Sequence, residues 1–387
     1  MSLPPQRVGY RQKELNYLLH LHSFYSEMEV PEYRKEHQPL INLLAVSGYP
    51  FVLYRMPGDS VAHIFIPATT ETLTLSQPWV GKEGFLFAPF DPDESSVLFL
   101  HPLNPAAFAL KSDKPIWDTA QYNETQQETY LQLIKKTLLF IGDSKVKKIV
   151  LSGVFRQSWG GPHRSAQLFE SLCALYPDAY CYIAFVPGQG LWAGASPETL
   201  VQWEMGQLQT MALAGTLPAN SDTSWGLKEA HEHDWVVTYI EKILHQETKN
   251  TPEMRGPEEM RAGAIRHLCT KFRIDCSQNE ALHIAFKLHP TPAVCGIPQE
   301  EALQFIRENE PHPRGLYTGF AGLVSNQQVR LFVNLRCARL GTTEAIIFAG
   351  GGITIDSIPE AEWDEINLKR GTLSAALLRT LYSTQTI

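Results

Sequence analysis

Two carboxylates and one ammonium group stand at helical spacing near the C-terminal end of the sequence. Glu362, Glu365 and Lys369 are three and four residues apart, so a helix would place their side chains on one face. Three consecutive glycines at 350–352 follow an apolar run, which predicts a strand and then a glycine turn. Such a face can hold Mg²⁺ together with a carboxylate substrate. The alternative is a solvent-exposed charged stripe with an internal ion pair.

The segment that contains these charges is predicted to be one long helix from Pro359 to about Leu381. Ser357 and Glu360, three residues apart at its start, have the signature of a capping box. The charged face would therefore follow directly after the glycine turn.

A third carboxylate, Glu232, belongs to a predicted helix over 228–246. It lies one turn before Val236 on the apolar face, so its charge points toward the interior and requires a cation. Zinc bound through His231 and His233 does not suit the pattern, because residues two apart lie on different faces of a helix. Two interpretations remain open. One is Mg²⁺ shared with the C-terminal helix, and the other is a first-turn glutamate stabilised by the helix dipole.

A general acid and a general base are also available at the ends of predicted strands. Glu198 follows an apolar strand and a Ser-Pro turn, and in a cleft its pKa would rise enough for it to act as an acid. Lys148 begins a predicted strand over 148–155, and a buried lysine can lose its proton near neutrality and act as a base. The ordinary alternatives are a surface glutamate and a strand-edge lysine that prevents aggregation.

The bulk composition indicates a soluble, folded protein. Of its 387 residues, 44% are hydrophobic and 19% are charged, and the net charge of −8 argues against a general nucleic-acid binder. The six cysteines include no C-x-x-C pair and are expected to be reduced thiols. The N-terminus has no signal-peptide pattern, and no apolar run approaches the roughly 20 residues that span a bilayer. We therefore expect a cytoplasmic monomer without a membrane or nucleic-acid partner.

The predicted elements indicate an α+β fold with large antiparallel sheets, because strands come in hairpin-like runs interrupted by long helices. The polar stretch 247–257, with two prolines, is the most linker-like segment. Further helices are predicted at 15–25, 125–141 and 165–176. Further strands are predicted at 50–54, 62–66, 96–100, 179–186, 191–193, 200–204, 207–214, 319–325, 329–339 and 344–349.

Ten short segments resemble, in the same order, the motifs of the chorismate-utilising enzyme family. They lie within about residues 125–382, whereas residues 1–124 match weakly, and we expect a single domain over 1–387. The segments are 148–152 (KIVLS), 194–198 (GASPE), 213–216 (LAGT), 228–233 (KEAHEH), 267–270 (HLCT), 289–296 (HPTPAVCG), 317–319 (YTG), 335–339 (LRCAR), 348–352 (FAGGG) and 360–369 (EAEWDEINLK).

The resemblance implies a fold of two large antiparallel β-sheets packed face to face, with helices outside and the site in a cleft between the sheets. It also implies isochorismate synthase activity. Lys148 would be the base that activates water for attack at C2 of chorismate, and Glu198 the acid that protonates the departing C4 hydroxyl. By the same likeness, Glu232 and Glu365 would bind Mg²⁺, with Glu362 in support. The substrate would be bound by Gly215, Thr216, His267, Ala293, Tyr317, Arg336, Gly350 and Lys369.

A few positions bear on which member of the family the chain resembles. Amine-adding relatives are expected to lack Lys148 or to have a lysine within LAGT, where this chain has Ala214. Salicylate-forming relatives more often have threonine where Ala293 stands, so the sequence favours a reaction that stops at isochorismate, for menaquinone or siderophore synthesis. A salicylate synthase and a non-catalytic chorismate-binding protein are the alternatives. The chain departs from the family pattern at Gly153, where arginine is usual, and at 350–352, where Gly-Ala-Gly is commoner.

Overall fold

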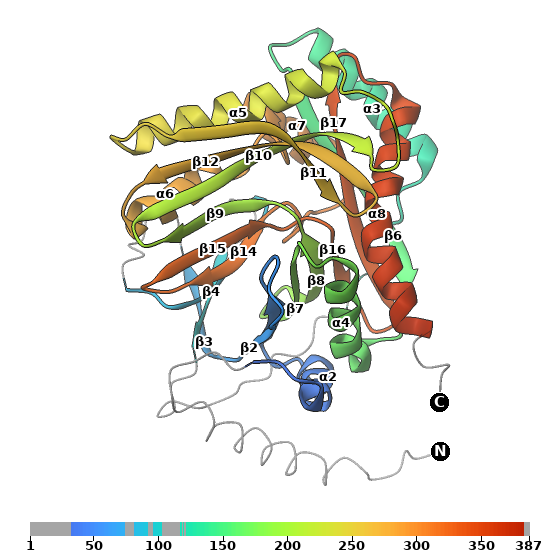
Figure 1. Cartoon of the computed structure of the whole chain (residues 1–387). Coiled ribbons are helices and arrows are strands. Elements are labelled where there is room, and N and C mark those ends of the chain that lie inside the picture. The colour runs from blue at the N-terminus through green and yellow to red at the C-terminus, as the bar shows by residue number, and fades with distance from the viewer. Residues whose placement is uncertain are drawn as a thin grey trace.

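Two antiparallel β-sheets packed face to face form the centre of the molecule, and helices cover their outer faces (Figure 1). The computed structural model describes residues 32–73, 81–91, 96–102, 117, 119 and 121–382. The arrangement confirms the predicted α+β fold. The helix predicted at 15–25 lies outside the described residues.

The first sheet has eight strands, and all of its neighbouring pairs are antiparallel. In spatial order they are β13 (Gly296–Ile297), β6 (Lys148–Ser158), β17 (Glu344–Thr354), β16 (Cys337–Leu340), β8 (Gly190–Ser196), β7 (Tyr180–Val186), β1 (Phe51–Arg55) and β2 (His63–Phe65). β6 and β17 form a long antiparallel pair. Lys148 lies on β6, and the three glycines at 350–352 lie on β17.

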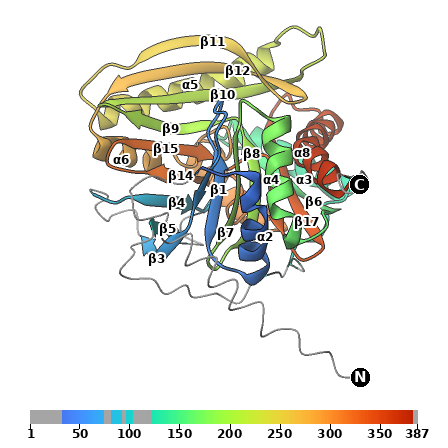
Figure 2. The same ribbon diagram turned by 60° about the horizontal axis from the view of Figure 1, so that its bottom comes forward.

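The second sheet has nine strands, which are again antiparallel. In spatial order they are β11 (Glu253–Ala262), β12 (Ile265–Asp275), β10 (Gln207–Pro218), β9 (Thr199–Glu204), β15 (Gln328–Val333), β14 (Phe320–Val324), β4 (Gly84–Ala88), β5 (Val97–Pro102) and β3 (Pro67–Leu73). Strands from the N-terminal part of the chain thus form one edge of each sheet (Figure 2).

Helices pack on the outer face of each sheet (Figure 1). α5 and α6 cover the nine-stranded sheet, whereas α3, α4 and α8 cover the eight-stranded sheet. The helices are η1 (Lys35–His37), α2 (Gln38–Ser47), α3 (Gln127–Gly142), η3 (Pro162–Arg164), α4 (Ser165–Leu175), α5 (Leu227–Glu247), α6 (Gln278–Leu288), α7 (Gln299–Asn309) and α8 (Pro359–Tyr382). Within the described part of the chain, no helix has the length and apolar character needed to cross a membrane.

Aromatic side chains fill much of the space between the two sheets. Tyr180 of β7 stacks on Phe332 of β15 with ring centroids 4.3 Å apart, which joins the eight-stranded sheet to the nine-stranded sheet. Phe348 of β17 stacks between Trp192 and Tyr317, at 5.5 and 5.1 Å. Stacked aromatic pairs bury large apolar areas and have preferred geometries, so they fix the spacing of the sheets.

After β6, the chain crosses between the two sheets at two short links. Residues 197–198 join β8 to β9, and residues 334–336 join β15 to β16. At the second link Arg336 has a left-handed backbone with φ of 47°, which a strand cannot accommodate. The single strand predicted at 329–339 is therefore wrong, because this segment forms two strands that belong to different sheets.

Two other local predictions are also wrong. The glycines at 350–352 do not form a turn but continue β17, paired residue by residue with β6. The linker-like stretch 247–257 contains the start of β11, which pairs with β12 from Glu253 onward. In both segments the partner strand supplies order that the local composition does not indicate.

A buried ion pair in the segment that follows α7 is hydrogen-bonded to β6. Arg314 and Glu310 form a bidentate pair, with Nη2–Oε1 and Nε–Oε2 distances of 2.6 and 2.8 Å, and both side chains are only 2% exposed. Arg314 also donates to the carbonyl oxygens of Val294 and Val150, at 2.9 and 2.7 Å. Glu310 accepts from the backbone N–H of Ser152 at 2.7 Å. Removing either partner would leave the other as an uncompensated buried charge.

The Arg314→Met substitution is expected to lower the free energy of unfolding by about 3–5 kcal/mol, because Glu310 then stays buried without its cation. Denaturant unfolding followed by circular dichroism measures this loss. Arg330→Met is the matched control, since it removes an arginine from the more exposed pair with Glu204 and should cost less than about 1 kcal/mol. Equal losses in the two variants would contradict the role given to the buried pair.

Candidate active site

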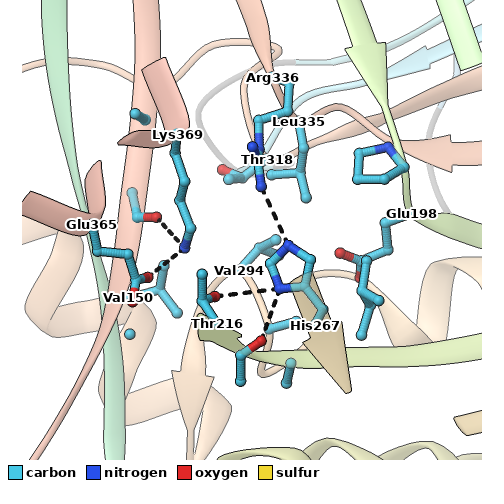
Figure 3. A pocket seen from close by; sticks show the side chains of 18 of the residues that line it. Val150, Glu198, Thr216, His267, Val294, Thr318, Leu335, Arg336, Glu365 and Lys369 are labelled. Atoms are coloured by element: carbon cyan, nitrogen blue, oxygen red, sulfur yellow. Dashed lines mark hydrogen bonds and ion pairs between the residues drawn. The ribbon is translucent and has the colours of Figure 1, made fainter. Parts of the chain in front are cut away.

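One cavity opens between the two sheets, and nearly all of the predicted site residues line it (Figure 3). The exception is Glu362, which is buried next to the cavity but is not part of its wall. The predicted residues that line the cavity are Lys148, Glu198, Gly215, Thr216, Glu232, His267, Ala293, Tyr317, Arg336, Gly350, Glu365 and Lys369. Residues far apart in the sequence thus meet at the place where the two sheets face each other.

A β-bulge brings Gly215 and Thr216 into the cavity wall. The register between β10 and β12 shifts between Ala214 and Leu217, so these two residues have no direct partner in the ladder. Gly215 has a left-handed backbone with φ of 71°, which glycine adopts without strain. Its carbonyl oxygen therefore turns toward His267 on the neighbouring strand.

His267 is neutral and has a defined tautomer. Its Nδ1 lies 2.8 Å from the Gly215 carbonyl oxygen, which can only accept, so Nδ1 carries the proton. Nε2 is then free to accept from Arg336 Nη2 at 3.4 Å. Burial and the nearby charges of Arg336 and Lys369 lower the pKa of His267 to about 3. The imidazole therefore orients the Arg336 guanidinium without adding a charge of its own (Figure 3).

Glu198 is held protonated at neutral pH by its surroundings. Its side chain is 3% exposed, and burial raises its pKa to about 8, although Lys148, Arg336 and Lys369 act in the opposite direction. The backbone around it is fixed, because its carbonyl accepts from the N–H of Val333 at 3.0 Å. Glu198 lies in the first crossing link and Arg336 in the second, so both chain crossings deliver a functional side chain to the cavity.

Lys148 lies at the start of β6 and is 3% exposed. Its Nζ is 3.2 Å from Glu232 Oε2, which comes from α5 on the other sheet. Glycine at position 352 makes this approach possible, because a Cβ there would overlap the Lys148 side chain and lie 3.1 Å from Glu232 Oε2. Glu232 therefore points inward as the sequence predicted, and its immediate partner is an ammonium group.

Glu362 and Glu365 face the same glycine strand from α8. A Cβ at Gly351 would lie 3.5 Å from Glu362 Oε2 and 3.5 Å from Glu365 Oε1. Lys369 Nζ is 2.6 Å from Glu365 Oε1 and donates to the Gly350 carbonyl at 3.0 Å, so the predicted face of one helix is confirmed. The hydroxyl of Ser357, which was predicted to cap this helix, donates to Glu362 Oε1 at 2.7 Å.

The three glutamates fit the chemistry of Mg²⁺. Carboxylate oxygens are its preferred ligands, and Glu232, Glu362 and Glu365 all converge on the strand formed by residues 350–352. Glu362 is 1% exposed, and its buried Oε2 has no hydrogen-bond partner, which is costly unless a cation or donor satisfies it. The pKa of Glu362 is raised by this burial and by the neighbouring charge of Glu365.

Some residues of the site were not assigned by the sequence. Lys228 stands in a recognised motif, but its contact with Glu362 joins two helices 134 positions apart and cannot be seen locally. Thr318 follows Tyr317 and lines the cavity with a left-handed backbone, φ of 58°, which is unusual for a β-branched residue. Arg314 donates to the Thr318 hydroxyl at 3.3 Å and so helps to hold this conformation. The signal available for Lys228 was its i, i+4 spacing to Glu232.

Comparison with known proteins identifies the family. A model of the chorismate binding enzymes matches residues 103–378 of this chain. The chain belongs to the chorismate binding enzyme family. The resemblance seen in the sequence motifs is thereby confirmed. Residues of those motifs together line the cavity.

Several members of the chorismate binding enzyme family are similar to this chain. A vibriobactin-specific isochorismate synthase of Vibrio cholerae is 31% identical over 309 residues, which cover 76% of this chain and 78% of that relative. Isochorismate synthase EntC of Escherichia coli is 30% identical over 260 residues, which cover 64% of this chain and 66% of that relative, just under two thirds. The structure of MenF, the menaquinone-specific isochorismate synthase of Escherichia coli, has the same fold, with a TM-score of 0.73 and 23% identity over 95% of this chain and 99% of that one.

The Gly352→Ala substitution is expected to reduce turnover about 100-fold or more, because the new methyl group displaces the Lys148 ammonium from its position. The fold should survive, since the displaced atoms belong to a flexible side chain. Steady-state kinetics with chorismate measures the loss of turnover, and thermal unfolding measures whether the fold survives. Gly371→Ala in α8 is the control, because its Cβ would meet nothing within 4 Å. Normal turnover in the Gly352 variant would contradict the placement of Lys148.

Proposed function

We propose that this protein is an isochorismate synthase that converts chorismate reversibly to isochorismate with Mg²⁺. The observation that supports this most strongly is one cavity that contains both a buried lysine and a protonated carboxylic acid, Lys148 and Glu198. A protein that only bound chorismate would need neither group. The similarity to relatives named isochorismate synthases points to the same reaction.

Lys148, once its ammonium group has released a proton to solvent, is a neutral amine that accepts a proton from water as that water attacks C2 of the ring. Glu198 donates its proton to the C4 hydroxyl, which departs as water while the double bonds of the ring shift. One water adds and one leaves, so substrate and product are isomers and the reaction can run in both directions. The raised pKa of Glu198, about 8, keeps the proton available at neutral pH.

The cationic side of the cavity binds the two substrate carboxylates. Arg336 and Lys369 supply the charges, and Tyr317 supplies a hydroxyl beside the Gly350 backbone. His267 keeps the Arg336 guanidinium in orientation through the 3.4 Å contact. Gly215 and Thr216 complete this wall through the β-bulge. Anion binding by fixed, partly desolvated cations is stronger than in water and orients the ring between base and acid.

Glu232 and Glu365 would hold the Mg²⁺ ion, with Glu362 in support. When bound, Mg²⁺ would neutralise the C1 carboxylate of the substrate and orient it. We expect the enzyme to act as a cytoplasmic monomer, as its sequence and composition indicate. The isochorismate would enter menaquinone or siderophore synthesis, the pathways named for its relatives.

The function is tested by incubating the full chain with chorismate and Mg²⁺ and separating the products by chromatography, beside a metal-free control. The proposal requires a mixture of chorismate and isochorismate that forms without pyruvate. Salicylate with one equivalent of pyruvate would replace it with a salicylate synthase and show that Ala293 does not stop the reaction at isochorismate. Binding of chorismate without any product would identify a non-catalytic binding protein.

Lys148→Ala and Glu198→Gln are each expected to abolish measurable turnover, because one removes the base and the other the transferable proton. Mg²⁺-dependent binding of chorismate, measured by calorimetry, should remain within a few fold of the unmodified protein. Lys271→Ala and Glu204→Gln are matched controls at exposed positions, with side chains 55% and 52% exposed. Near-normal turnover in either cavity variant would refute its assigned role.

A further inference from the structure

Each glutamate assigned to Mg²⁺ is paired with a lysine of the protein itself. Lys148 pairs with Glu232 at 3.2 Å, and Lys369 pairs with Glu365 at 2.6 Å. Among the described residues, no group of three or more histidine, cysteine, aspartate or glutamate side chains is arranged so that it could hold a metal ion. The protein's own cations therefore occupy part of the space that a divalent ion would need.

Lys228 differs from the other two lysines. It is not part of the cavity wall, and it contacts two carboxylates on two helices. Its Nζ is 2.5 Å from Glu362 Oε1 on α8 and 3.9 Å from Glu232 Oε1, one turn further along α5. The side chain is 28% exposed, so it reaches the buried carboxylates from the solvent side. Lys228 thus links α5, which packs on one sheet, to α8, which packs on the other, by a charged hydrogen bond.

The environment of Glu362 explains why this link is needed. Its side chain is 2% exposed, and an ionised carboxylate at that depth requires a counter-ion. Lys228 and Ser357 both bind Oε1, whereas Oε2 is buried without a partner on the side that faces Gly351 and Glu365. One oxygen of this carboxylate is thus satisfied by the protein, and the other is available to a cation.

We infer that Lys228 and Mg²⁺ compete for the same carboxylates, so that Lys228 sets the metal affinity of the enzyme. This inference rests on the proposed Mg²⁺ role of the glutamates. An ammonium group beside Glu232 and Glu362 stabilises them when no metal is bound, and it repels a divalent ion at the other oxygens of the same carboxylates. Movement of the Lys228 ammonium away from Glu362, toward the solvent from which its side chain enters, would weaken this repulsion.

Two consequences follow for a variant that keeps most of the length of the side chain but removes its charge. Lys228→Met should bind Mg²⁺ roughly tenfold more tightly, because the competing charge is gone. The metal-free form of this variant should unfold at a lower temperature, since Glu362 then lacks its cation. The rise in unfolding temperature on adding saturating Mg²⁺ should therefore be larger than in the unmodified protein.

The experiment is calorimetric titration of Mg²⁺ into the metal-stripped full chain without substrate, together with thermal unfolding with and without Mg²⁺. Lys271→Met is the matched control, because it also removes one lysine from a Lys–Glu pair, at an exposed site on β12. Lys228→Gln is a second test variant, which keeps a hydrogen-bond donor near Glu362 and guards against a folding defect in the methionine variant.

Tighter Mg²⁺ binding in the Lys228 variants, with Lys271→Met unchanged, is the expected result. Unchanged or weaker binding in both Lys228 variants would overturn the inference, since Lys228 would then be neutral or helpful toward the metal. Glu365→Gln separates this outcome from a failure of the metal assignment. If Glu365→Gln binds Mg²⁺ as tightly as the unmodified protein, the proposed metal site is wrong. The inferred competition between Lys228 and Mg²⁺ is then wrong as well.

Discussion

Burial of titratable side chains between the two sheets governs the behaviour of this site. A low-dielectric space favours the uncharged form of a titratable group. It raises the pKa of Glu198 to about 8 and lowers that of His267 to about 3, so both are neutral near pH 7. Arg336 and Lys369 line the same cavity, and in the proposed reaction they would be the cations that face an anionic substrate. One physical cause thus provides a proton donor, an uncharged orienting group and a binding field in the same cavity.

The backbone makes this concentration of charge possible. Residues 350–352 form a strand without side chains, against which Lys148, Glu232 and Glu365 can pack closely. The two chain crossings and the β-bulge at Gly215 supply the opposite wall. The crossing links and the bulge interrupt the regular pairing of strands. These interruptions coincide with the positions of the proposed functional groups. The aromatic stack around Phe348 keeps the two walls at a fixed separation.

Much of this could be predicted from the sequence. Helical spacing correctly placed Glu362, Glu365 and Lys369 on one face, and the ordered motifs indicated both the family and the cavity wall. Local patterns failed where a distant partner decides the structure. The strand predicted at 329–339 is divided between two sheets by the backbone of Arg336, and the glycines at 350–352 are held extended by β6. The link from Lys228 to Glu362 likewise depends on where the fold places α5 relative to α8, which no single segment encodes.

The protonation state of Glu198 is the central claim, and it can be measured directly. Infrared difference spectroscopy follows the carbonyl band of a protonated carboxylic acid across a pH titration, and the Glu198→Gln variant assigns the band to this residue. The account predicts a band that is present at pH 7 and disappears with an apparent pKa of about 8. A Glu198 that titrates near its ordinary value of about 4.3 would be ionised at neutral pH and would contradict its role as the acid.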